Sequence, residues 1–118
     1  MSVTPLDPIL HQPVRTQIAA YLAGRGKASF TELKKALEVT DGNLDAHLKK
    51  MIESEYVEAT KDETSGSRQT IYVLSKQGMH ALTGYLVQLE KLVGEARSMT
   101  SVAKNTGAHL RNKSAKPA

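Results

Sequence analysis

The sequence predicts a mainly α chain that carries one small β-hairpin, and is therefore α+β in class. Three observations lead to this prediction. Apolar residues recur at the three- and four-residue intervals of buried helix faces through the first half of the chain. After Ser54 the pattern changes to two short β-branched and aromatic runs, which are typical of strands. A last apolar series with heptad spacing predicts one long helix.

The first helix follows an irregular lead-in over residues 1–8, where two prolines disfavour regular structure. Helical spacing begins at once after it, and Pro13 is tolerated because proline fits the first turn of a helix. The apolar face consists of Ile9, Leu10, Val14, Ile18, Tyr21 and Leu22. Two glycines then end the helix.

Two shorter helices come next. Ser29, with Glu32 three residues later, has the form of a capping box and begins a helix of about two turns. Thr40 is a good N-cap for a third helix that ends near Ser54. The buried stripe of this third helix is predicted as Leu44, Leu48, Met51 and Ile52.

Strands are predicted at residues 56–60 and 70–74, and the polar segment between them forms the tip of a hairpin. Ser75 is the expected N-cap of the long helix, which runs to about Gly94 or Ala96. Its seam is Met79, Leu82, Leu86, Leu89 and Val93. A helix of about twenty residues is roughly 30 Å long, so it extends beyond a small helical body and a second chain is expected to cover it.

The net charge of +4 is unevenly distributed. Five of the 16 Lys and Arg residues lie after Glu95, the last acid, so eleven bases face twelve acids in residues 1–96. The body therefore carries −1 and the segment 97–118 carries +5. This segment has low apolar density and is expected to be a disordered tail behind a domain that spans 9–96. The tail either adds attraction to phosphates or only improves solubility.

Several function classes are excluded by composition. The chain has no cysteine, which excludes disulfides, thiolate metal sites and a cysteine nucleophile. The four histidines lack partners at metal-ligand spacing, apart from Asp7 before His11 and Asn43 before His47, so no metal or other cofactor is expected. There is no glycine-rich phosphate loop, nucleophile elbow or pair of catalytic carboxylates, and we expect no enzyme.

No apolar run is long enough to span a membrane, and the start of the chain does not resemble a secretory signal. We therefore expect a soluble cytoplasmic protein without a membrane partner. With five aromatic residues and no tryptophan, its core is expected to be aliphatic.

The predicted order is helix, short helix, tight turn, helix, hairpin, long helix. Two short helices joined by about three residues form a helix-turn-helix. A hairpin directly after the second of them makes the winged form, so the sequence predicts a winged helix-turn-helix with a long C-terminal dimerisation helix.

The residues themselves support this order. The segment FTELKKALEVTDGNLDAHLKKMI, residues 30–52, resembles the helix-turn-helix of small MarR- and ArsR-like transcription regulators. The segment GSRQTIYVLSKQG, residues 66–78, is similar to the wing of these families, and the likeness covers about residues 9–93. The resemblance implies a dimeric regulator of double-stranded DNA, with the helix 40–54 in the major groove and the hairpin tip at the flanking backbone or minor groove.

Two residues depart from the family pattern. The family often has glycine at the positions of Glu38 and Glu55, just past the ends of the second and third helices, where a left-handed backbone ends a helix. A side chain at such a position is expected to cost about 1 kcal/mol if the conformation is kept.

Base-reading residues are expected in the N-terminal half of the third helix, on the side opposite its buried stripe. Asn43 suits adenine, Asp41 suits cytosine, and Ala46 suits a thymine methyl group. The candidates are Thr40, Asp41, Asn43, Ala46 and His47. Two of them have structural alternatives, because Asp41 also suits the positive end of the helix dipole and a histidine in this place often packs or bonds locally.

Contacts to the DNA backbone are expected from the rest of that helix and from the hairpin. Arg68 is the strong cation near the tip, and an arginine there suits a narrow minor groove or a phosphate. The candidates are Lys49, Lys50, Lys61, Ser65, Ser67, Arg68 and Gln69. The alternative is a solvated loop in which Asp62 and Glu63 neutralise the cations.

The dimer interface is predicted to combine the long helix with the first one, through Ile9, Leu10, Val14, Ile18, Met79, Leu82, Leu86, Leu89 and Val93. A twofold dimer predicts a pseudo-palindromic operator, and we expect a sequence-specific repressor. Two alternatives stay open. One is a winged-helix module that binds another protein, and the other is a sensor whose small effector binds near Tyr21 or Tyr85.

Overall fold

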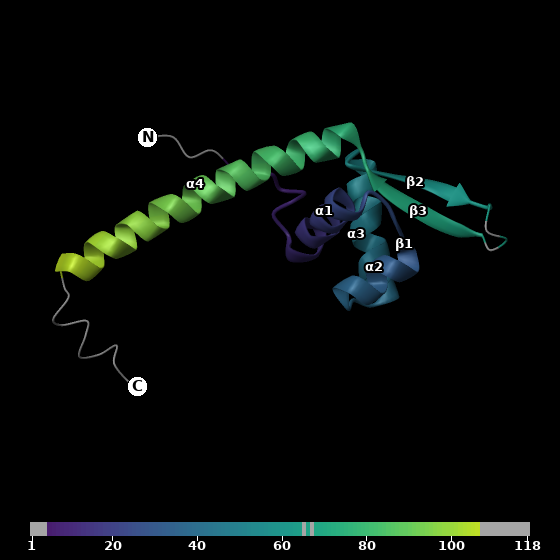
Figure 1. The fold of residues 1–118 in the computed structure, drawn as a ribbon, viewed down its shortest axis with the longest axis horizontal. Helices are drawn as coiled ribbons and strands as arrows, with labels where there is room; N and C mark the ends of the chain where they lie inside the picture. Colours follow the sequence, from purple (N-terminus) through teal and green to yellow (C-terminus); the bar gives the residue numbers. More distant parts are fainter. Residues whose placement is uncertain (1–4, 65, 67, 107–118) are drawn as a thin grey trace. The chain divides into compact units, whose positions relative to one another are not determined.

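The computed structural model describes residues 5–64, 66 and 68–106, and the chain divides into two units, one ending at Tyr85 and one beginning at Leu86. The predicted winged helix-turn-helix is confirmed (Figure 1). The elements in chain order are α1 Pro13–Arg25, β1 Ala28–Ser29, α2 Phe30–Leu37, α3 Asp41–Glu53, β2 Val57–Asp62, β3 Gln69–Leu74 and α4 Lys76–Thr106.

Three helices begin at the N-caps that the sequence predicts, Ser29, Thr40 and Ser75. Each hydroxyl accepts a hydrogen bond from the backbone N–H three residues later, at 3.1, 3.2 and 2.9 Å respectively. These bonds satisfy N–H groups that the first turn of a helix leaves without an intrahelical acceptor. The caps therefore fix the starts of α2, α3 and α4.

Two helices end in left-handed backbone without glycine. Glu38 follows α2 with φ 53°, and Glu55 lies just past α3 with φ 65°. Both positions therefore keep the left-handed conformation for which the family often uses glycine. Each residue costs about 1 kcal/mol relative to glycine, because its Cβ crowds the backbone in this region.

The predicted hairpin is confirmed and its strands are longer than expected. β2 and β3 are antiparallel, with Val57 opposite Leu74 at the base and Asp62 opposite Gln69 near the tip. A third strand was not expected. β1 has two residues, too few for an alternating pattern, and it pairs with β3 to give the sheet order β1-β3-β2. Figure 1 shows α1, α2 and α3 gathered on one side of the hairpin.

The core between these helices and the sheet is mainly aliphatic, as predicted. Its largest fully buried side chains are Leu10, Ile18, Leu22, Leu33, Leu44, Leu48, Met51 and Val57. Tyr72 and Tyr85 join them. The prediction for Ile52 was wrong, since its side chain is 38% exposed while Met51 is fully buried. Seven residues after Leu44 the helix returns to the same face, and one residue further it has turned about 100° away.

α4 continues to Thr106, beyond the predicted end at Gly94 or Ala96. No glycine or proline lies between residues 95 and 106, so nothing in the sequence breaks the helix there. The first part of the expected irregular tail is therefore helical. The rest of that tail, residues 107–118, lies outside the described residues.

Two glycines of α4 make a matched test of the packing at its start. A Cβ on Gly78 would collide with the carbonyl oxygen of Tyr56 and lie 2.9 Å from Cδ1 of Leu74, whereas a Cβ on Gly84 meets nothing within 4 Å. We expect Gly78→Ala to lower the free energy of unfolding by about 1–3 kcal/mol. Gly84→Ala should raise it by up to about 1 kcal/mol, because alanine favours helices. Urea unfolding followed by circular dichroism measures both, and two shifts of the same sign would contradict this packing.

Candidate nucleic-acid interface

The exposed side of α3 carries the residues that a DNA-reading helix needs. Leu44, Leu48 and Met51 bury one side against the body, which leaves a polar side in solvent. The exposed residues of the helix other than Ile52 are Asp41, Gly42, Asn43, Asp45, Ala46, Lys49, Lys50 and Glu53. Asn43 and Ala46, three residues apart, are neighbours on this surface in the N-terminal half.

Thr40 and Asp41, two of the candidates for base reading, make structural contacts at the start of α3. The hydroxyl of Thr40 accepts the cap hydrogen bond from Asn43 N–H. Asp41 lies in the first turn of α3 and its Oδ1 is 2.8 Å from Nζ of Lys34 on α2. This ion pair and the helix dipole both account for an acid at this place, which favours the structural interpretation of Asp41.

The two lysines of α3 differ in their surroundings. Nζ of Lys49 lies 3.1 Å from Oδ2 of Asp45, one turn earlier in the helix. Lys50 is exposed and forms no ion pair with any described residue. An exposed pair such as Lys49–Asp45 is weak, so both lysines are accessible to phosphates.

His47 lies at the edge of this exposed side and is held from α1. Nη1 of Arg15 donates a hydrogen bond to Nδ1 of His47 at 3.0 Å. Burial lowers the pKa of His47, and the neighbouring Arg15 guanidinium lowers it further. Burial and the contact with Arg15 both disfavour the protonated ring, which agrees with the structural alternative of local packing for this histidine. Local spacing could not predict the contact with Arg15, since 32 residues separate the partners.

The hairpin presents the expected basic side chains. Lys61 and Gln69 are exposed on the strands, and Arg68 is exposed just before β3. Among the described residues, neither cation forms an ion pair. Ser65 and Ser67 lie outside the described residues.

Asp62 is held within the hairpin and is not an ion-pair partner of the basic residues around it. Its Oδ1 accepts hydrogen bonds from the hydroxyl of Thr64 at 2.6 Å and from the Thr64 N–H at 3.0 Å. These bonds lower the pKa of Asp62, with a smaller contribution from the charge of Lys27. The part of the tip that the structure describes therefore does not support neutralisation of Arg68 by Asp62.

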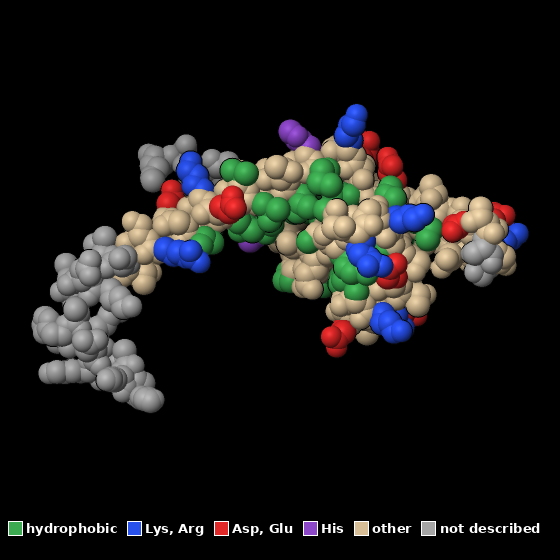
Figure 2. Space-filling model, viewed as in Figure 1, with side chains coloured by type: hydrophobic (Ala, Val, Ile, Leu, Met, Phe, Trp, Pro, Cys, Tyr) green, Lys and Arg blue, Asp and Glu red, His purple; other side chains and the backbone are tan. Residues whose placement is uncertain are grey.

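Charges on the body are mixed. Figure 2 shows Lys and Arg side chains interspersed with Asp and Glu on the face in view, without one large basic patch. This agrees with the charge of −1 for residues 1–96. Attraction to phosphates must therefore come from a few individual cations.

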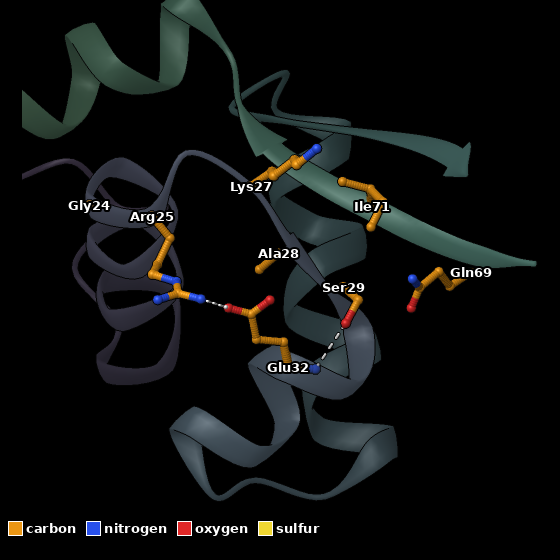
Figure 3. Close-up of a pocket in the computed structure, with 8 residues that line it drawn as sticks. All are labelled: Gly24, Arg25, Lys27, Ala28, Ser29, Glu32, Gln69 and Ile71. Carbon is orange, nitrogen blue, oxygen red and sulfur yellow. Dashed lines mark hydrogen bonds and ion pairs between the residues drawn. The ribbon is translucent and has the colours of Figure 1, made fainter. Parts of the chain in front are cut away.

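A cavity of about 470 Å³ lies beside the C-terminal end of α1 (Figure 3). It is lined by Gly24, Arg25, Lys27, Ala28, Ser29, Glu32, Gln69 and Ile71. Glu32 accepts a hydrogen bond from the Tyr21 hydroxyl at 2.6 Å and pairs with Arg25 at 3.1 Å. The bond to Glu32 raises the pKa of Tyr21, and the same bond lowers that of Glu32. The region near Tyr21 thus has room for a small molecule, although Arg25 and Glu32 already pair with each other.

The second position expected for a small effector, near Tyr85, is not part of this cavity. Tyr85 is buried, and its hydroxyl lies 2.9 Å from Nδ1 of His11. It does not line the cavity beside α1. Within the described ranges, no three His, Asp or Glu side chains gather as a group that could hold a metal ion. Those ranges also contain no helix with the length and apolar character to cross a membrane.

The predicted dimer residues fall into three groups. Leu10, Ile18 and Leu82 are buried in the core of the single chain, so they offer no surface to a partner. This corrects their assignment, and the cause is that a helical seam also serves the chain's own core. The half-buried members are Ile9, Val14 and Leu89. The exposed members are Met79 at 42%, Leu86 at 45% and Val93 at 44%.

Further exposed apolar residues lie on α4 outside the predicted seam. They are Val87, Leu92 and Met99. The heptad spacing missed them because they lie on other sides of the helix. In the second unit, α4 therefore exposes apolar side chains on more than one side.

A three-stranded sheet with a helix-turn-helix whose second helix is exposed defines a winged helix DNA-binding protein. The comparison with known families agrees, since the model described as winged helix DNA-binding domain matches residues 14–93. The chain belongs to this family. The match begins one residue into α1 and ends at Val93, the last residue of the predicted seam of α4.

Individual relatives fit this assignment. The chain is 37% identical over 84 residues to the uncharacterised protein MJ0432 of Methanocaldococcus jannaschii, covering 71% of this chain and 91% of the relative. It is 30% identical to a transcriptional regulator homologue of Pyrococcus horikoshii OT3, with a TM-score of 0.71 over 75% of this chain and 87% of that one.

The fold extends to more distant regulators. Reduced YodB of B. subtilis, a transcriptional regulator, is 21% identical, with a TM-score of 0.62 over 70% of this chain and 79% of that one. At this identity the similarity concerns the fold alone. Together with the family match, these structures confirm the winged helix-turn-helix fold and the transcription-regulator class that the resemblance implies.

The Arg15–His47 contact predicts a pH dependence of stability. The folded chain holds the His47 pKa below the ordinary 6.5, so the unfolded chain binds the proton first as the pH falls. The free energy of unfolding should therefore decrease as the pH falls from about 6.5 toward the folded pKa, and this contribution should level off below it. In His47→Asn, where Oδ1 replaces Nδ1 as acceptor, that decrease should be absent. Urea unfolding of both proteins across this range measures the difference, and parallel curves would contradict it.

Proposed function

We propose that this protein is a sequence-specific regulator of transcription that binds double-stranded DNA as a homodimer. It acts in the cytoplasm as a repressor on a pseudo-palindromic operator. The observation that carries the proposal is the exposed side of α3, where Asn43 and Ala46 lie together in the N-terminal half of the helix. An asparagine can bond both N6 and N7 of adenine, and a small neighbour lets the helix approach the base edges.

The roles divide by position. Asn43 and Ala46 read bases, while Lys49, Lys50 and the hairpin residues Lys61, Arg68 and Gln69 hold the backbone. Ser65 and Ser67 are proposed for the same task as Arg68, from the sequence alone. Thr40 and Asp41 lie beside the reading residues and are proposed to orient them, since each is already engaged within the chain. His47 lies beside them with its Nδ1 engaged by Arg15.

Dimerisation is proposed through α4. Leu86, Leu89 and Val93 follow one another at steps of three and four residues, and Leu86 and Val93 are more than two-fifths exposed. Apolar side chains in such a seam are covered by a second helix in coiled-coil packing. A dimer also doubles the number of cations that reach one DNA duplex, which a body of −1 requires for useful affinity.

Selection of genomic fragments on the purified protein tests the DNA proposal first, and the expected result is a shared inverted repeat. On that repeat, Asn43→Ala should relax base preference at one position of each half-site, at a cost of about 1–3 kcal/mol. Arg68→Ala should weaken all sequences alike and reduce the salt slope by about 1. Arg25→Ala is the control, because this arginine pairs with Glu32 beside the cavity and should change neither quantity.

The operator proposal and the assigned residue roles are each contradicted by a definite result. If no shared repeat is recovered at moderate salt, the operator proposal is lost and a protein-binding winged helix becomes the better explanation. If Arg68→Ala changes base preference as much as Asn43→Ala does, the assigned roles are wrong. A small effector would appear as a ligand that changes the affinity for the selected repeat.

A second experiment concerns the dimer. A charge in the seam should break it, so Leu86→Glu and Val93→Glu are expected to sediment as monomers at micromolar concentration where the wild type is a dimer. Val87→Glu is the matched control, since Val87 is 57% exposed but lies about 100° around the helix from Leu86. It should remain dimeric. A monomeric wild type would remove the dimer and the palindrome together.

A further inference from the structure

Arg15 makes an unusual set of contacts for an arginine within a folded body. Its Nε–H donates to the carbonyl of Ile9 at 2.6 Å, its Nη1 donates to Nδ1 of His47 at 3.0 Å, and its Nη2 lies 3.5 Å from the carbonyl of Pro8. All three acceptors are neutral. The guanidinium is thus fixed in place without losing its charge to a carboxylate.

This positive charge has no counter-ion in the part of the chain that the structure describes. The ion pairs there join Arg25 to Glu32, Lys34 to Asp41 and Lys49 to Asp45, and none includes Arg15. Arginine has five N–H groups, and three are committed to the contacts above, so two are still available. The first turn of α1, where Arg15 lies, also contains no acid. A partly exposed cation with spare donors, beside a helix start, suits an anion.

The same contact fixes the proton of His47. Arginine only donates, so Nδ1 of His47 must be the acceptor, and the neutral ring carries its proton on Nε2. Nε2–H is therefore a donor on the side of the ring away from Arg15. His47 lies four residues after Asn43 and three before Lys50, both exposed, so all three share one strip of α3.

We propose that Arg15 and His47 together form a phosphate-binding site at the α1 edge of the DNA interface, where both donate to one phosphodiester group of the backbone. The inference rests on the proposed function and adds α1 to the elements that contact DNA. Arg15 supplies the charge and also positions the ring. His47 supplies a neutral donor whose tautomer is set before DNA arrives, and its lowered pKa agrees with this role. The site carries no sequence information and anchors α3 in register.

The test measures affinity and salt slope on short duplexes of the selected repeat and of unrelated sequence. Arg15→Met removes a charge, and we expect weaker binding to both duplexes by tenfold or more and a salt slope reduced by about 1. His47→Asn keeps an acceptor for Arg15 but loses Nε2–H. We expect about tenfold weaker binding to both duplexes with an unchanged slope, since a neutral donor releases no counter-ion.

A double variant separates a joint site from two independent ones. If Arg15 sets the tautomer, the loss from His47→Asn should largely disappear in the Arg15→Met background. Arg15→Lys keeps the charge and should retain the wild-type slope. Arg25→Met, at the other end of α1, is the control and should leave affinity and slope unchanged. Circular dichroism confirms that each variant is folded, and nitrogen chemical shifts of His47 report its tautomer directly.

Two outcomes would overturn the inference. A folded Arg15→Met with the wild-type slope shows that the arginine meets no phosphate, and a His47→Asn that binds as the wild type shows that the ring donates nothing. If Arg15→Met fails to fold, His47→Asn still decides. Failure here while Asn43→Ala relaxes base preference would leave the proposed function standing. A wild type that binds neither duplex would remove both.

Discussion

The winged helix depends on the joint at Ser75, where the chain leaves the sheet and enters α4. The Ser75 hydroxyl donates to the carbonyl of Glu55 at 2.6 Å and accepts from Gly78 N–H at 2.9 Å. The Ser75 N–H donates to the carbonyl of Tyr56 at 2.9 Å. One buried residue thus ties the end of α3, the base of the hairpin and the start of α4. α3 and the hairpin of β2 and β3 keep a fixed spacing only if this joint is intact.

Two features of the backbone near Ser75 follow from this joint. Glu55 adopts a left-handed backbone there, which turns the chain from α3 into β2 within a few residues. Gly78 has no Cβ, because the Tyr56 carbonyl occupies that space. The Tyr56 ring is held too, since its hydroxyl donates to Oδ2 of Asp7 at 2.6 Å, and burial with this bond raises its pKa to about 12. Asp7, in the described part of the lead-in, is therefore part of the folded body.

Local signals in the sequence were sufficient for much of this fold. A hydroxyl residue just before an apolar helical pattern predicts a helix start, and Ser29, Thr40 and Ser75 all act in this way. β-branched runs likewise predict the hairpin. The strand β1 could not be predicted, because two residues carry no period and depend on the partner strand. Whether an apolar helix residue faces its own core or another chain is also a tertiary property, and heptad spacing alone therefore does not distinguish Leu82 from Leu86.

The candidate interface, too, could be predicted only where local spacing in the sequence determines it. Asn43 and Ala46 follow from the period of α3 alone, whereas Arg15 meets His47 only because α1 packs against α3. The Arg15–His47 contact bears on the DNA affinity expected of a body with a net charge of −1. A body of −1 has no general attraction for DNA, so its affinity depends on cations that are fixed, correctly placed and not already paired. Arg25 is paired with Glu32, while Arg15 keeps its charge among neutral acceptors. Position and pairing, more than the number of basic residues, therefore decide where a phosphate can bind.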